Sequence, residues 1–168
     1  EPTPTPPACA GMLPVLAGHT ESQAAQNKVI FGRNTAGLLA AACHGAALLH
    51  NTSNAKADAL HDYGMHLGIA FQLADDLLDY AGDPSETGKN VGDDLAEGKI
   101  TLPLLHAMKV GDERDRRLVA DTLRNKDGSA FADIMTVVQR TGGIEATREA
   151  ALQHQNKAMA ALERLGQN

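Results

Sequence analysis

Apolar positions recur at helical spacing over most of the chain, and every element that this pattern predicts is a helix. Thr35–His50 is almost wholly apolar and rich in small residues, so we expect a helix that is buried on most sides. Ala55–Tyr80 predicts a longer helix that carries polar positions near its end. Three later runs also predict helices: Glu113–Asn125, Ala130–Arg140 and Ile144–Leu165. No stretch predicts a strand, so the expected fold class is all-α.

Glycine, proline and capping residues divide these runs. A polar loop with glycines is expected from Ala81 to about Val91. Thr101 is expected to cap a further helix that has Pro103 in its first turn. Gly64 and Gly68 lie four residues apart on the longer helix, so we expect another helix to approach that face closely.

The first part of the chain lacks the helical period. Prolines stand at positions 2, 4, 6, 7 and 14 and interrupt any regular element. We therefore read residues 1–27 as a flexible, proline-rich leader and residues 28–168 as the helical domain.

Composition narrows the choice of partners. The formal net charge of −6 argues against nucleic acid as the main partner, although a phosphorylated substrate needs only a few local cations. Two cysteines are too few for a disulfide framework. The start of the chain lacks the basic region of a signal peptide, and no apolar run reaches membrane-spanning length. A soluble, cytoplasmic protein is expected.

The polar positions near the end of the long helix form one acidic arc. At about 100° per residue, Asp75, Asp76 and Asp79 fall at about 0°, 100° and 40°, with Gln72 at about 60°. Crowded carboxylates are unfavourable without a counter-charge, and Mg²⁺ with a phosphate on its far side would supply one. The leucines of this stretch are expected to face a core instead: Leu73, Leu77 and Leu78.

A loop with two lysines follows the aspartates. Lys89 and Lys99 each come directly after a glycine, and a lysine ammonium binds phosphate as a point charge. Carboxylates followed by such a loop suit a diphosphate ligand. The acidic residues between the lysines are expected to cap or solvate a short helix rather than bind metal: Asp93, Asp94 and Glu97. The seven histidines show no metal-binding spacing, and we expect them to be structural.

The runs FQLADDLLDY and GKNVGDDLAEGKITLPLL strongly resemble the second aspartate-rich region of trans-polyprenyl diphosphate synthases. The flanking runs YGMHLGIAFQ and VIFGRNTAGLLAAACHGAALL resemble the same family, most of all its long-chain, octaprenyl diphosphate synthase-like members. The likeness covers about Val29 to Leu165. It implies an isoprenoid-synthase-type helical bundle, of which this chain is the C-terminal half with about five to seven helices.

The resemblance also implies roles for the residues that match the family's motifs. Asp75, Asp76 and Asp79 would hold Mg²⁺ and, through it, an allylic diphosphate. Lys89 and Lys99 would contact that diphosphate. Thr35 and Gln72 would line the substrate pocket beside the reacting allylic carbon. Phe71 would line the same pocket near isopentenyl diphosphate. The full-length family is expected to form homodimers.

Two departures from the family pattern limit this reading. The family has a lysine directly before the threonine, whereas this chain has Asn34-Thr35. The first aspartate-rich motif with its paired arginines, and the upstream basic site for isopentenyl diphosphate, are absent from the sequence. The first hypothesis is a Mg²⁺-dependent trans-prenyltransferase fragment that is inactive alone. The alternatives are a truncated, non-catalytic partner subunit of a synthase and, less favoured, a terpene cyclase.

Overall fold

The computed structural model describes residues 35–81, 92–126 and 128–166, and within these ranges the regular structure is helical, without strands. Seven α-helices and one short 3₁₀ helix, η2, make up this part of the chain. Their bounds are α3 Gly37–Leu49, α4 Asn54–Ala81, α6 Asp93–Ala96, α7 Leu102–Val110, α8 Glu113–Asn125, η2 Gly128–Ala130, α9 Phe131–Arg140 and α10 Gly143–Gly166. The expected all-α class is confirmed. None of these helices is long and apolar enough to cross a membrane.

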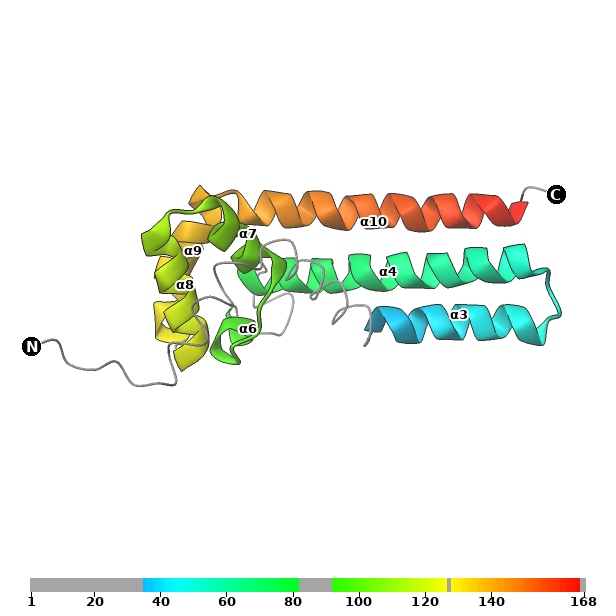
Figure 1. The fold of residues 1–168 in the computed structure, drawn as a ribbon, viewed down its shortest axis with the longest axis horizontal. Coiled ribbons are helices and arrows are strands. Elements are labelled where there is room, and N and C mark those ends of the chain that lie inside the picture. Colours follow the sequence, from blue (N-terminus) through cyan, green and yellow to red (C-terminus); the bar gives the residue numbers. More distant parts are fainter. Residues whose placement is uncertain (1–34, 82–91, 127, 167–168) are drawn as a thin grey trace, which may run out of the picture.

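Three long helices lie side by side in one layer, with α4 between α3 and α10 (Figure 1). Small residues allow α3 and α4 to pack closely. A Cβ atom added to Gly64 would lie 2.6 Å from the Leu39 carbonyl oxygen, and one added to Gly68 would collide with Ala36. The expected close approach at both glycines is therefore confirmed, since any larger side chain would push the helices apart.

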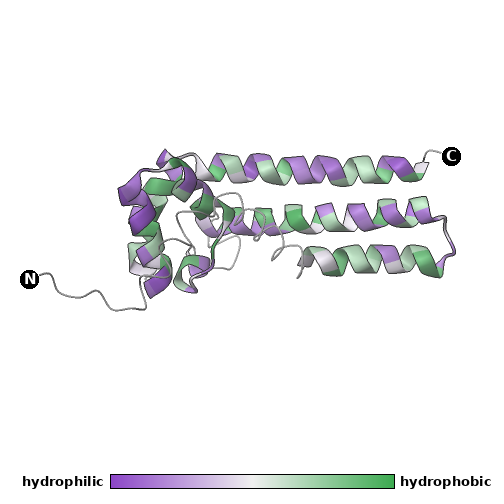
Figure 2. Ribbon diagram, viewed as in Figure 1, coloured by the Kyte–Doolittle hydropathy of each residue, from purple (hydrophilic) through white to green (hydrophobic). Residues whose placement is uncertain are grey.

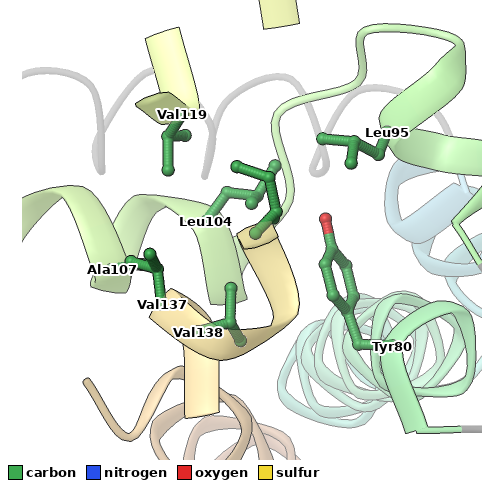
Figure 3. Packing of buried hydrophobic residues seen from close by; sticks show 8 residues of the cluster. Tyr80, Leu95, Leu104, Ala107, Val119, Val137 and Val138 are labelled. Atoms are coloured by element: carbon green, nitrogen blue, oxygen red, sulfur yellow. The ribbon is translucent and has the colours of Figure 1, made fainter. Parts of the chain in front are cut away.

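The short helices gather at the C-terminal end of α4 and surround the main apolar core (Figure 1). Tyr80 reaches into this core from α4, where it meets Leu95 of α6, Leu104 of α7, Val119 of α8 and Val138 of α9 (Figure 3). These five side chains are at most 2% exposed. The core therefore fixes α6 and the start of α7 against the end of α4.

The predicted helix bounds agree with the structure to within about two residues. The helix predicted at 55–80 spans Asn54–Ala81, and that at 113–125 has the predicted bounds. Asp112 caps the latter, because its side chain accepts from the Asp115 N–H while the Asp115 side chain accepts from the Asp112 N–H. The proposed leader, residues 1–27, and most of the loop expected from Ala81 to about Val91 lie outside the described residues.

The burial predicted for the first helix is wrong. Leu38 and Leu49 of α3 are 74% and 85% exposed, and the residues of this helix that are buried are Ala40 and Ala47. Figure 2 shows most of α3 as hydrophobic, although it lies at the edge of the layer. An apolar pattern indicates which residues can be buried, whereas neighbouring elements decide which of them are covered.

Two local expectations also need correction. Leu78 is 47% exposed, so it does not face the core, whereas Leu73 is buried as predicted. Thr101 precedes α7, but its hydroxyl makes no capping hydrogen bond and instead donates to the Tyr80 hydroxyl oxygen, at 2.9 Å. A capping hydroxyl accepts from a backbone N–H, whereas the Thr101 hydroxyl is directed to the buried Tyr80 oxygen.

Candidate active site

The acidic arc of α4 faces the protein interior. Asp76 and Asp79 are 1% and 6% exposed, and they share a helix face with the buried residues Leu73 and Tyr80. Leu73, Asp76 and Asp79 follow one another at a spacing of three residues, and Tyr80 comes four residues after Asp76, so one face of α4 packs against α6 and α7. Asp75 lies at the margin of this face and is partly exposed. The sequence argument placed the carboxylates on one side of the helix but did not foresee that this side is covered.

Asp76 has few hydrogen-bond donors for a buried carboxylate. The Leu102 N–H at the start of α7 lies 3.4 Å from its Oδ2 atom, and the Gln72 side chain also hydrogen-bonds to it. Burial raises the pKa of Asp76 to about 7, and the negative charges of Asp94 and Asp75 add to that effect. At neutral pH this carboxyl is therefore poised between its protonated and ionised forms.

Asp79 is also incompletely satisfied. The Asp94 N–H lies 3.4 Å from its Oδ1 atom. Its Oδ2 atom is buried and has no hydrogen-bond partner within the described ranges. Burial raises the pKa of Asp79, and the nearby charges of Asp94 and Asp93 raise it further. A buried carboxylate oxygen without a donor calls for a proton or a cation.

The start of α6 brings two more carboxylates to the site. Gly92 adopts φ 90°, which favours glycine, and its N–H donates to the Asp79 carbonyl oxygen at 3.0 Å. This link sets Asp93 and Asp94 in the first turn of α6, close enough to influence Asp79. Asp94 is thus a site residue that the sequence argument assigned only to helix capping or solvation. Its spacing from Asp79 gave no signal, because the packing of α6 on α4 creates the proximity.

Lys99 supplies positive charge at the edge of this acidic cluster. Its Nζ atom lies 2.8 Å from Asp94 Oδ1 and 2.8 Å from Glu97 Oε2. Its hydrogen bond to Asp94 is the main reason that its pKa is raised, and the bond to Glu97 contributes next. The side chain remains 57% exposed, so the ammonium can exchange these partners for a ligand. Lys89, the other predicted phosphate ligand, lies outside the described residues.

The three predicted pocket residues are placed differently. Gln72 is half-buried and contacts Asp76 through the hydrogen bond described above. Thr35 is half-buried beside Ala36, which packs on Gly68 one turn before Gln72. Phe71 is 63% exposed. The structure thus brings Gln72 to the aspartates and Thr35 to the same stretch of α4, whereas the Phe71 ring faces outwards.

The carboxylates fit a hard divalent cation in chemistry but are not preassembled around one. In the part of the chain that the structure describes, no three His, Cys, Asp or Glu side chains converge on a common point where a metal could be held. Asp79 Oδ2 nevertheless has no hydrogen-bond partner within the described ranges, and burial raises the pKa of Asp76, so a cation beside these carboxylates would favour their ionised forms. Oxygen ligands of this kind suit Mg²⁺, which is commonly bound through one or two carboxylates while it keeps several waters.

Comparison with known proteins identifies the family. The polyprenyl synthetase family matches residues 16–140, a range that includes α3, α4 and every site residue named above. The chain belongs to the polyprenyl synthetase family. The match begins inside the segment that the sequence analysis assigned to the leader.

Relatives and solved structures of polyprenyl synthetases agree with this assignment. Octaprenyl diphosphate synthase of Escherichia coli (strain K12) is 41% identical over 137 residues, which make up 81% of this chain and 42% of the relative. Heptaprenyl diphosphate synthase component 2 of Geobacillus stearothermophilus is 33% identical over 136 residues, 81% of this chain and 42% of the relative. The structure of a polyprenyl synthase from Caulobacter crescentus CB15, complexed with calcium and isoprenyl diphosphate, superposes with a TM-score of 0.73 at 40% identity. That superposition covers 80% of this chain and 42% of the other. The chain therefore spans about two fifths of the length of these relatives.

Proposed function

We propose that this chain carries the allylic-diphosphate half of a Mg²⁺-dependent trans-prenyltransferase site. The observation that carries the proposal is the uncompensated acidic cluster, in which a buried Asp79 oxygen lacks a donor among the described residues. Membership of the polyprenyl synthetase family supports it. The Caulobacter structure, which is a complex with calcium and isoprenyl diphosphate, also supports the proposal, because calcium and magnesium both prefer oxygen ligands.

The proposal gives each site residue a physical task. Asp75, Asp76 and Asp79 hold Mg²⁺, which when bound neutralises negative charge on the leaving diphosphate. Lys99, released from Asp94, contacts the diphosphate, and Lys89 does the same.

The residues beside the diphosphate act on the hydrocarbon side. The carbon–oxygen bond of the allylic diphosphate breaks with its electron pair on the diphosphate, and the side-chain oxygens of Gln72 and Thr35 stabilise the allylic cation. The double bond of isopentenyl diphosphate attacks that cation, and loss of a proton completes the longer prenyl diphosphate. The first aspartate-rich motif is absent from this sequence, so we expect no chain elongation by this polypeptide alone.

A binding measurement tests the proposal without requiring turnover. Calorimetric titration with inorganic diphosphate is expected to show binding in the presence of Mg²⁺ and none with EDTA. Asp75→Ala should abolish that binding. Asp121→Ala is the matched control, because Asp121 is an exposed aspartate on α8 that pairs with Arg124. Equal diphosphate binding by the wild type and Asp75→Ala would contradict the proposal.

The second candidate function is that of a non-catalytic partner subunit of a synthase. The specific observation in its favour is that one relative is named as a component of a heptaprenyl diphosphate synthase. Under this alternative, the chain shows neither Mg²⁺-dependent diphosphate binding nor any response to Asp75→Ala. Incubation with Mg²⁺, farnesyl diphosphate and labelled isopentenyl diphosphate gives a further check, since robust elongation by the chain alone would exclude this role.

A further inference from the structure

Two histidines from different helices meet between α4 and α10. His66 of α4 and His154 of α10 lie with their Nδ1 atoms 3.1 Å apart. Their ring centroids are 5.1 Å apart, the rings are tilted by 59°, and both side chains are half-buried. His66 precedes Asp76 by about three helical turns, so this histidine pair is separate from the aspartate site.

The spacing of the two nitrogens suits a metal ion as well as a hydrogen bond. A neutral imidazole has one N–H donor and one lone pair, so at this distance one Nδ1 donates to the other. A metal that replaces the shared proton would bind both nitrogens at about 2.05 Å. Two nitrogens 3.1 Å apart then subtend an angle of roughly 98° at the metal, between the square-planar and tetrahedral values.

The ligand type selects the class of metal. Imidazole nitrogen suits borderline divalent ions such as Zn²⁺, whereas the carboxylates at the end of α4 suit Mg²⁺. We propose that His66 and His154 form a two-histidine site for a borderline transition-metal ion, with Zn²⁺ as its probe and water completing the coordination. The bound ion joins α4 to α10, and this site replaces the purely structural role that the sequence analysis expected for these histidines.

The chain contains a matched control. His44 of α3 and His61 of α4 also meet between two helices, with ring centroids 5.7 Å apart. Their rings pack edge to face at 83° instead of bringing two nitrogens together as a hydrogen-bonded pair. His44→Gln and His61→Gln therefore remove an interhelical histidine contact without touching the proposed ligands.

Zinc titration of the full chain tests the proposal. The titration is run at about pH 7.5, where imidazoles are mostly neutral, with excess Mg²⁺ to occupy carboxylates. We expect one equivalent of Zn²⁺ to bind, and His66→Gln or His154→Gln each to weaken binding at least roughly tenfold. The two control variants should bind within about twofold of the wild type. Equal affinity in wild type, His66→Gln and His154→Gln, or a loss of binding only in the controls, would overturn the proposal.

A second readout needs no variant and so does not depend on how the substituted chains fold. Electron paramagnetic resonance of one equivalent of Cu²⁺ on the wild-type chain is expected to show coupling to two imidazole nitrogens. A spectrum with oxygen ligands alone would overturn the proposal. Both experiments are run with excess Mg²⁺ and without diphosphate, the copper sample included, so their outcome is independent of the proposed prenyltransferase site.

Discussion

Asp115 of α8 is buried, as are Asp76 and Asp79 of α4, yet the surroundings of Asp115 are opposite to those of the other two. Asp115 Oδ1 accepts from Arg140 Nη2 at 2.6 Å, and its Oδ2 accepts from the Asp112 N–H at 2.9 Å. The hydrogen bond from Arg140 is the main cause of its lowered pKa. Asp76 and Asp79 have raised pKa values, and each has one backbone N–H at 3.4 Å, with the Gln72 side chain as a further partner of Asp76. Asp115 therefore has its counter-charge built into the fold, whereas the proposed function leaves the counter-charge of Asp76 and Asp79 to bound Mg²⁺.

The largest expected effect is on the affinity for diphosphate, which should depend on Asp79 of α4 and not on Asp115 of α8. Asp79→Ala removes the oxygen that lacks a donor, so it should weaken Mg²⁺-dependent diphosphate binding by roughly a hundredfold. Asp115→Ala should leave the affinity of the folded chain unchanged, because Asp115 lies in the cap of α8. Calorimetry with inorganic diphosphate measures both. Similar losses of affinity in the two variants would contradict the proposed difference between Asp79 and Asp115.

The next largest effect is expected in how the free energy of unfolding depends on pH. The folded pKa of Asp76 is about 7, above its ordinary value of 3.8, so between these values the folded chain binds more protons than the unfolded chain. The free energy of unfolding should therefore fall as the pH rises from about 4 to about 7. Asp76→Asn should remove this fall and stabilise the chain at pH 8 by on the order of 2 kcal/mol. Urea unfolding with EDTA across that pH range measures the difference, and parallel curves for the two chains would contradict it.

Asp115 should show the opposite pH dependence. Because its folded pKa is lowered, its contribution to stability is present above the ordinary carboxyl pKa and is lost as the pH falls through the folded value. Asp115→Asn should lower the Tm at pH 7 by about 5 °C, since it weakens the Arg140 contact and the cap of α8 together. Thermal unfolding at pH 7 and at acidic pH checks this. A Tm loss that grows towards low pH would be evidence against the assigned role.

The smallest effect is expected at Lys99. Lys99→Met removes the ammonium from Asp94 and leaves that charge uncompensated beside Asp79. The pKa of Asp79 should rise further, while overall stability changes by only a few tenths of a kcal/mol, because the Lys99 side chain is 57% exposed and its ion pair is screened by solvent. Carboxyl chemical shifts measured against pH follow the pKa, with Lys109→Met on α7 as the control. An unchanged Asp79 pKa would show that Asp94 acts independently of Lys99.

Local signals in the sequence predicted the helices well, because periodic apolar positions and capping residues operate within one element. The helix at Glu113–Asn125 is the clearest case, since the bounds predicted from its local pattern are those of the structure. Burial was harder to predict. The outward exposure of Leu38 on α3 depends on which elements lie beside that helix, and no pattern within it carries this information.

The candidate site, like the burial of the helices, could be predicted only in part from the sequence. Helical spacing put Gln72 and the aspartates on one arc, and the structure keeps that grouping while burying Asp76 and Asp79. The contribution of Asp94 was missed, because it depends on the packing of α6 against α4. The structure does not test the proposed roles of Thr35 and Phe71, which stay predictions.

The pKa of Asp76 gives the most direct test of the claim that the α4 carboxylates await a cation. Nuclear magnetic resonance titration of the carboxyl carbons should give an Asp76 pKa near 7 in EDTA. With Mg²⁺ and inorganic diphosphate present, it should fall by at least about one unit, because a bound cation favours the ionised form. The pKa of Asp115 should stay where it is in the same sample, since Arg140 already neutralises it. An Asp76 pKa that is the same with and without Mg²⁺ and diphosphate would contradict the account.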